Sequence, residues 1–137
     1  MIDPLKILPG YALRRASAAM LADLGGRLAP LELRPTEASI LFLIACNPDI
    51  TQSDIGRTLD IQRANMTPLA ARLEERGLIN RVPVDGRSQG LVLTAAGEAL
   101  VAKLRLVIEQ HEANLLSRIP KEHRPHILPA LQALFEN

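Results

Sequence analysis

The sequence predicts a mainly α-helical protein that carries one small β-hairpin. Apolar residues recur every three or four positions over most of the chain, which is the period of an amphipathic helix. Aromatic residues make up only 2% of the 137 residues, so the cross-strand ring pairs that stabilise β-sandwiches are scarce. The 47% hydrophobic and 23% charged residues are those of an ordinary globular chain, and the length fits a single domain, residues 1–137.

Two helices are expected before residue 50. Apolar positions three or four residues apart around Leu13 predict an amphipathic helix within residues 5–28. Pro30 closes this segment, because the residue before a proline is driven out of the α region. A second helix should begin at Pro35, which the first turn tolerates, and run to about Asn47. It is apolar on nearly every side, so it should be buried.

The next two helices predict a helix-turn-helix. Thr51, followed three residues later by Asp54, resembles a capping box that opens a short helix to about Leu59. After the tight connection 60–62, a second apolar stripe lies on one helical face and ends at Gly77, a typical C-terminal cap. The stripe consists of Met66, Leu69, Ala70 and Leu73.

Pro68 complicates the second of these helices. In a helix that begins at Gln62, it removes the hydrogen bond to the carbonyl of Ala64. In a helix capped by Asn65, it falls harmlessly in the first turn. We therefore expect this helix either to start late or to be kinked near Pro68. Which of the two occurs determines how far Gln62 and Arg63 extend from the protein surface.

A hairpin and two more helices complete the chain. Residues 78–84 have strand character, a polar tip follows at residues 85–90, and residues 91–93 form a β-prone return. Thr94 then caps a long helix over about residues 95–116, and a last helix is expected over residues 122–135. Residues 48–50 are expected to be a linker.

The predicted order of helices and hairpin is that of a winged helix-turn-helix lobe, residues 33–94, flanked by long helices at both ends. The outer helices carry more apolar surface than a lobe of about 60 residues can cover. A helix-turn-helix protein that binds two symmetry-related half-sites in DNA must also be a dimer. We therefore expect a homodimer built from residues 5–28 and 98–135, and a pseudo-palindromic operator in double-stranded DNA.

Five short motifs stand in register along the chain. They are Leu33-Arg34-Pro35-Thr36-Glu37, Thr51-Gln52-Ser53-Asp54-Ile55-Gly56, Leu73-Glu74-Glu75-Arg76-Gly77-Leu78-Ile79-Asn80-Arg81, Asp85-Gly86-Arg87 and Leu93-Thr94-Ala95-Ala96-Gly97. Together they resemble the multiple antibiotic resistance regulator (MarR) family of bacterial transcription factors, by motif over residues 33–105 and by arrangement elsewhere. The resemblance implies a ligand-responsive repressor that blocks promoter access. A cytoplasmic location is expected because the single cysteine cannot form an intramolecular disulfide and no signal-peptide pattern opens the chain.

Five residues are expected on the DNA-facing side of the second helix of the helix-turn-helix. That helix enters the major groove, where arginine pairs with guanine and asparagine or glutamine with adenine. The candidates, on the face opposite the apolar stripe, are Gln62, Arg63, Asn65, Thr67 and Arg72. The alternative is an ordinary solvated helix face.

The wing and the preceding helix supply the other DNA candidates. Arg87, at the hairpin tip, can enter a narrow minor groove while Asp85 holds its guanidinium, a role that the resemblance implies for both. Ser88 lies beside them. Gln52 and Ser53 open the first DNA-side helix.

A ligand site between the dimer helices and the winged lobe is implied by the resemblance. The candidate lining residues are Tyr11, Arg14, Arg15, Phe42 and Cys46. An arginine there suits a carboxylate, so the expected effector is an aromatic acid or its thioester. Surface arginines and core rings are the alternatives for the first four residues. Cys46 is expected to be a small core residue, with a redox sensor as the alternative.

Enzyme, metal and membrane functions are not expected. Residues 86–90 match the G-x-S-x-G nucleophile elbow, but they lie between two short strands and not at a strand-to-helix turn of a large sheet. His123 and His126 are more simply two exposed histidines than metal ligands. The apolar run of residues 38–48 is too short to span a bilayer. No cofactor is expected, and a winged-helix module that binds protein and not DNA is the alternative function.

Overall fold

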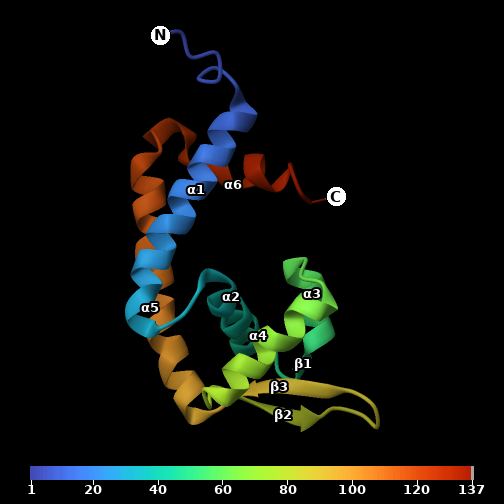
Figure 1. Cartoon of the computed structure of the whole chain (residues 1–137). Coiled ribbons are helices and arrows are strands. Elements are labelled where there is room, and N and C mark those ends of the chain that lie inside the picture. Colours follow the sequence, from blue (N-terminus) through green and yellow to red (C-terminus); the bar gives the residue numbers. More distant parts are fainter. Residues whose placement is uncertain (137) are drawn as a thin grey trace.

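The computed structural model describes residues 1–136 and consists of a long helical pair with a smaller lobe at one end (Figure 1). Helices α1 and α5 pack side by side, and α2, α3, α4 and a three-stranded sheet form the lobe. The helices are α1 (Pro9–Leu28), α2 (Pro35–Cys46), α3 (Gln52–Leu59), α4 (Arg63–Glu75), α5 (Ala95–Arg118) and α6 (Arg124–Gln132), and the short 3-10 turns are Ala29–Leu31 and Lys121–His123.

The first helix lies within residues 5–28, as the sequence predicts. It begins at Pro9, whose fixed φ suits the first helical turn, and ends at Leu28 as expected. Pro30 lies in the 3-10 turn that follows, and Glu32 then takes a left-handed φ of 55°. Leu33, fully packed in the core, returns the chain to the start of α2.

The predicted capping box at the start of α3 is confirmed. The Thr51 hydroxyl accepts a hydrogen bond from the Asp54 N–H (3.1 Å), and the Asp54 carboxylate accepts one from the Thr51 N–H (3.3 Å). The hydrogen bonds from Thr51 are the main reason why the pKa of Asp54 lies below its ordinary value. The cap therefore keeps a negative charge at the positive end of the α3 dipole.

Helix α4 begins at Arg63, with Gln62 as its N-cap, so the late start, one of the two alternatives expected from Pro68, is wrong. The Gln62 carbonyl oxygen already accepts hydrogen bonds from the N–H groups of Asn65 and Met66, both at 2.9 Å. Pro68 therefore lies inside the helix. Burial of Met66 and of the apolar positions after it offsets the hydrogen bond that the proline cannot make.

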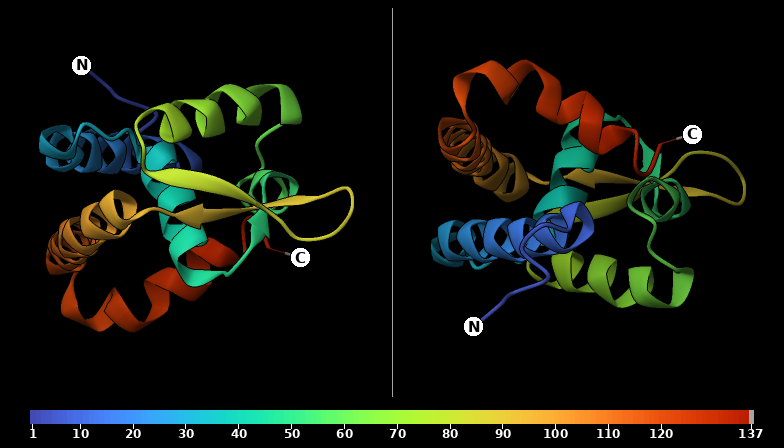
Figure 2. Two further views of the ribbon diagram at one scale, coloured as in Figure 1. Left: turned by 90° about the horizontal axis from the view of Figure 1, so that it is seen from below. Right: turned by 90° about the horizontal axis from the view of Figure 1, so that it is seen from above.

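The predicted hairpin is present, but the sheet has a third strand. Strands β2 (Ile79–Pro83) and β3 (Gln89–Leu93) pair antiparallel, and the short strand β1 (Ile50–Thr51) pairs with the other edge of β3. The prediction that residues 48–50 are only a linker is thus wrong at Ile50. Two residues are too few to show the alternating pattern of a strand. Figure 2 shows the hairpin projecting away from the α1 and α5 pair.

The core lies where α2 meets α4, β3 and the first turns of α5. Ile40 and Leu41 of α2 are fully buried, as the all-round apolar pattern predicts, and they belong to the same buried cluster as Leu73 of α4 and Leu91 of β3. The predicted stripe of α4 is buried at three of its four positions, and Leu69 is half-buried. These contacts set how α4 and the wing stand relative to each other.

One polar contact ties the two long helices together. The His111 ring nitrogen Nδ1 of α5 lies 2.7 Å from the Asp23 carboxylate of α1, and Arg27 binds the same oxygen at 2.8 Å. These two partners hold the pKa of Asp23 below its ordinary value, His111 having the larger effect. Among residues 1–136, no helix is both long and apolar enough to cross a membrane.

Candidate nucleic-acid interface

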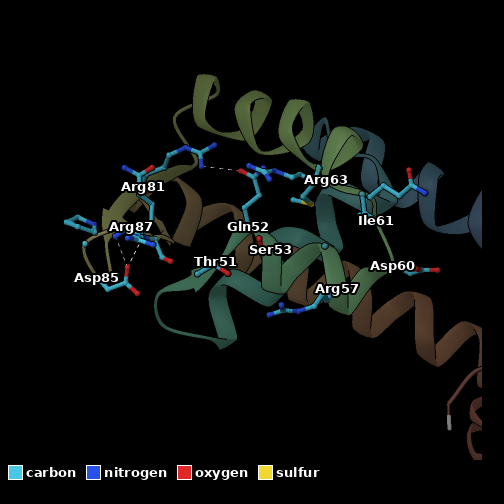
Figure 3. Close-up of a pocket in the computed structure, with 17 residues that line it drawn as sticks. Thr51, Gln52, Ser53, Arg57, Asp60, Ile61, Arg63, Arg81, Asp85 and Arg87 are labelled. Carbon is cyan, nitrogen blue, oxygen red and sulfur yellow. Dashed lines mark hydrogen bonds between the residues drawn. The ribbon is translucent and has the colours of Figure 1, made fainter.

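A hollow of about 960 Å³ lies between the start of α3, the start of α4 and the β2–β3 tip (Figure 3). Seven of the ten residues predicted to contact DNA line it. They are Gln52, Ser53, Gln62, Arg63, Asp85, Arg87 and Ser88. The fold thus brings helix and wing candidates, far apart in sequence, to one concave surface.

The hollow is lined by more positive than negative charge. Its arginines are Arg57, Arg63, Arg81 and Arg87, and its acids are Asp60 and Asp85. Arg57 pairs with Asp54, and Arg81 lies 3.4 Å from the Glu74 carboxylate. Neither Arg63 nor Arg87 forms an ion pair with an acid of residues 1–136. These two guanidinium groups are therefore free to meet an external anion or a base edge.

A chain of hydrogen bonds joins the three elements around the hollow. The Gln52 side-chain amide of α3 donates to the Thr67 hydroxyl of α4 (3.2 Å), and its oxygen accepts from Arg81 Nη1 of β2 (3.2 Å). Arg81 in turn reaches Glu74 near the end of α4. Gln52 and Thr67 thus hold the interface in shape, in addition to any contact with DNA.

The wing tip is held by Asp85, in a different way from the one expected. Its carboxylate oxygen Oδ1 accepts hydrogen bonds from the backbone N–H groups of Arg87 (2.8 Å) and Ser88 (2.7 Å). These two bonds hold the pKa of Asp85 below its ordinary value. The expectation that Asp85 holds the Arg87 guanidinium is corrected accordingly: the acid fixes the backbone of the tip (Figure 3), and no ion pair among residues 1–136 joins it to the guanidinium.

Three predicted DNA residues lie outside the hollow. Asn65 and Thr67 are exposed on α4, while Arg72 faces the buried Glu37 of α2, with Nε 3.3 Å from Oε2. Arg57 and Arg81 are the lining arginines that sequence reasoning missed. Strand alternation would not have found Arg81, because it shares a face of β2 with the buried Ile79. Arg57 could have been noticed from its place three residues after the capping acid.

The predicted ligand residues fall into separate groups. The Arg14 and Arg15 guanidinium groups lie 5.3 and 5.9 Å from the centre of the Tyr11 ring, on α1. Phe42 lies on α2 beneath Arg105 of α5, at 5.0 Å. No hydrogen bond or ring contact among residues 1–136 joins Phe42 to the Tyr11 group.

Cys46 differs from its expected environment. It is the last residue of α2 and is exposed, so the prediction of a small core residue is wrong. The apolar pattern of α2 extends to its last residue, but the helix leaves the core before it ends, beyond Ile44.

A second, apolar hollow of about 280 Å³ lies between α1, the start of α2 and the α3–α4 turn. Leu21 and Leu24 line it from α1, Pro35 and Ser39 from α2, and Ile61 from the turn. No sequence pattern predicts this hollow, because its walls come from separate segments of the chain. It lies against the same turn that positions Gln62 and Arg63.

Comparison with known proteins agrees with this geometry. The MarR family model matches residues 33–88. The structure of the transcriptional repressor CouR bound to a 23-mer DNA duplex is 34% identical, with a TM-score of 0.89, and the match covers 98% of this chain and 96% of that one. CouR bound to p-coumaroyl-CoA is 33% identical, with a TM-score of 0.87, over 100% and 99% of the two chains.

A relative among characterised proteins gives the same result. The HTH-type transcriptional repressor Rv2887 of Mycobacterium tuberculosis (strain ATCC 25618 / H37Rv) is 28% identical over 112 residues, which are 80% of this chain and 81% of that protein. The winged helix-turn-helix fold with long flanking helices is thereby confirmed. With identity above 30% over nearly the whole of CouR, the chain belongs to the MarR family of transcriptional regulators.

Proposed function

We propose that the chain acts as a homodimeric repressor, with α4 in the major groove of DNA and the β2–β3 tip in the minor groove. One observation carries the proposal: Arg63 and Arg87, both free of ion pairs within residues 1–136, stand on opposite sides of a single positively charged hollow. Arg63 is the first residue of α4, where a recognition helix meets base edges. Arg87 lies at the tip, where a narrow, electronegative groove would accept it.

The hollow between these two arginines suits a DNA backbone. A strand that separates the major from the minor groove must cross it, and the starts of α3 and α4 supply polar groups there. Ser53 and Gln62 can donate hydrogen bonds to phosphate oxygens, while Arg57 and Arg81 add positive potential. The CouR structure with a 23-mer duplex supports this placement, since that protein shares the fold at 34% identity.

Separate alanine substitutions of the two arginines test the DNA proposal. Arg87→Ala should weaken binding to many duplexes and lower the salt slope by about 1, since it loses a backbone or minor-groove contact. Arg63→Ala should cost about 1–3 kcal/mol on the preferred duplex and relax base preference. Fluorescence anisotropy over a salt series, on duplexes enriched from a random library, measures both.

Arg34→Ala is the matched control, because it removes an exposed arginine that lies outside both the hollow and the segments expected to form the dimer. Its affinity should equal that of the unmodified chain. If Arg63→Ala and Arg87→Ala also leave affinity unchanged, α4 and the wing do not read DNA. The chain would then be an interaction module for another protein.

We further propose that an aromatic acid or its thioester releases the DNA. CouR has been solved with p-coumaroyl-CoA, and Rv2887, at 26% identity, with salicylic acid. The 280 Å³ hollow is apolar and large enough for a single ring, and it is the candidate site for the ring. None of the five predicted ligand residues lines it; Arg14 and Arg15 lie beside Tyr11, nearer the start of α1. Thermal-shift screening of aromatic acids and their thioesters, followed by anisotropy on the bound duplex, tests this. A ligand that raises the melting temperature without releasing DNA would contradict it.

No catalytic activity forms part of the proposal. Ser88, at the centre of the G-x-S-x-G match, lies in the hairpin tip, and its backbone N–H binds Asp85. A nucleophile elbow instead needs a strand-to-helix turn with an adjacent histidine. The function rests on binding equilibria, between DNA-bound and effector-bound dimers.

A further inference from the structure

The C-terminal end of α4 is fastened to the connector, the segment of residues 29–34 that leads from α1 into α2. Arg76, the C-cap of α4, donates from Nη1 to the Glu32 carbonyl oxygen (2.7 Å) and from Nη2 to the Leu31 carbonyl oxygen (3.3 Å). One planar guanidinium thus donates to two successive carbonyls through two separate nitrogens, in a more rigid geometry than the flexible side chain of lysine would give.

A second arginine of α4 contacts the residue that caps α2. Arg72, one helical turn before Arg76, has its Nε 3.3 Å from Oε2 of Glu37. Glu37 is fully buried, and its other oxygen accepts the Arg34 N–H at 2.9 Å. Oε2 has no hydrogen-bond donor within the described chain, so Arg72 is the positive charge that balances this carboxylate. Removing one partner of such a pair leaves a buried charge uncompensated.

The connector is itself held firmly. Leu28 and Leu33, on either side of its 3-10 turn, are buried in the core, and Glu32 between them takes the left-handed φ of 55°. The Leu33 N–H also donates to the Leu28 carbonyl oxygen at 3.4 Å. The two carbonyls that Arg76 grips therefore keep a fixed position relative to the end of α1.

We propose that Arg72 and Arg76 are positioning residues that set the tilt of α4 relative to α1, and thereby the half-site spacing that the dimer accepts. The inference rests on the proposed function, a DNA-binding dimer joined through residues 5–28 and 98–135. It assigns these arginines a role in operator choice without any contact between them and DNA.

Helix α4 is long enough for a small tilt at one end to displace its other end by one base-pair step. Its 13 residues span about 20 Å at a rise of about 1.5 Å per residue. The fastened end lies at Arg76, and the reading end at Arg63. A tilt of about 10° at the fastened end moves the reading end by about 3.4 Å, which is one base-pair step. Loosening the two arginines would thus let each subunit reach neighbouring registers.

The experiment compares half-site spacing preference between variants. The duplex enriched by the unmodified protein from a random library is remade with one base pair added or removed between its half-sites, which rotates them by about 35°. The affinities for the three duplexes are measured by anisotropy for Arg72→Ala, Arg76→Ala and Glu37→Gln. Glu75→Ala is the control, since it removes an exposed charged side chain from the same end of α4 that forms no ion pair among residues 1–136.

The unmodified protein and Glu75→Ala should prefer the enriched spacing by about tenfold, given the cost of twisting DNA. The Arg72, Arg76 and Glu37 variants should reduce that preference to about threefold or less, with unchanged salt slopes. Arg76→Lys and Arg72→Lys keep the positive charge and should give spacing preferences between those of the unmodified protein and the alanine variants. They also provide a test if an alanine variant does not fold.

Two results would overturn the inference while leaving the proposed function intact. One is an unchanged spacing preference in variants that fold, which would make the contacts merely stabilising. The other is a salt slope lowered by about 1 in Arg72→Ala, which would make Arg72 a phosphate contact. A wild-type protein that enriches no duplex would instead overturn the DNA-binding function, and this inference with it.

Discussion

At the scale of single residues, Asp85 positions Arg87 without touching its guanidinium. Its Oδ1 accepts two backbone N–H groups of the tip, and these bonds keep the pKa of the carboxyl group below its ordinary value of 3.8. The acid is therefore ionised at neutral pH, and it fixes the backbone from which Arg87 extends. The position of its hydrogen-bonding oxygen, more than its negative charge, should therefore affect the affinity for DNA.

A pair of substitutions at Asp85 separates geometry from charge. Asp85→Asn keeps a side-chain oxygen that can accept the same two N–H groups, whereas Asp85→Ala removes it. We expect Asp85→Ala to bind DNA about tenfold more weakly than Asp85→Asn, because only the alanine variant loses the two hydrogen bonds, each of which contributes about 1 kcal/mol. Both variants lose the same charge, so attraction to the phosphates cancels in the comparison.

Anisotropy on one duplex measures this difference. Equal affinities for Asp85→Asn and Asp85→Ala would show that the tip does not need the two hydrogen bonds. In an Arg87→Ala background the difference should disappear, because the bonds act through the direction of that side chain.

Residue types, more than residue partners, can be predicted from the sequence. Arg63 and Arg87 do line the concave surface to which the sequence assigns them, because their positions follow from helix and hairpin periodicity. Arg72 is assigned to the same surface, but it faces Glu37, which comes from a separate helix. Such partners depend on how two elements pack, and local periodicity holds no information about that.

At the scale of elements, helix ends are predictable where a side chain caps them. Thr51 and Thr94 both accept the hydrogen bonds that their spacing predicts. The start of α4 is not predictable in this way, because Gln62 makes no side-chain cap and Pro68 indicates a later start. Packing of the apolar stripe of α4 against the core determines where this helix begins.

Gly97 shows how closely α5 docks on the lobe. A Cβ atom at this position would lie 2.0 Å from the Leu78 carbonyl oxygen. The Leu78 oxygen also accepts the Thr94 N–H at 3.0 Å, and the Thr94 hydroxyl donates to the Gly77 carbonyl oxygen at 2.6 Å. The first turn of α5 is thus fixed against the end of α4 and the start of β2.

Gly97→Ala should therefore destabilise the fold by about 2–3 kcal/mol, because backbone must move to admit one methyl group. Gly26→Ala is the matched control: it is a helical glycine with no neighbouring atom within 4 Å of the place an added Cβ would take, and the change should gain about 0.5–1 kcal/mol. Urea denaturation followed by circular dichroism measures both. A Gly97→Ala protein as stable as the wild type would mean that α5 is not docked as closely as this geometry requires.

At the scale of the whole molecule, exposed apolar side chains gather on the two outer segments. The N-terminal segment exposes Leu5, Ile7, Leu8, Leu13 and Leu21, and the C-terminal one exposes Leu106, Leu116, Leu128, Leu134 and Phe135. These positions fall within the ranges 5–28 and 98–135 predicted from the sequence to form the dimer. Leu128 and Phe135 are 61% and 73% exposed, which is costly for a chain that stays monomeric.

The double substitution Leu128→Glu/Phe135→Glu should separate the subunits, because an interface would have to bury two unpaired carboxylates. Sedimentation equilibrium should give twice the 15.0 kDa chain mass for the wild type and a single chain mass for the variant. Val84→Glu, which alters an exposed apolar residue of the wing, should stay dimeric. DNA affinity should fall in the double variant by more than tenfold, about 1.4 kcal/mol, since each separated lobe holds one half-site. A double variant that keeps twice the chain mass would place the interface elsewhere on the outer helices.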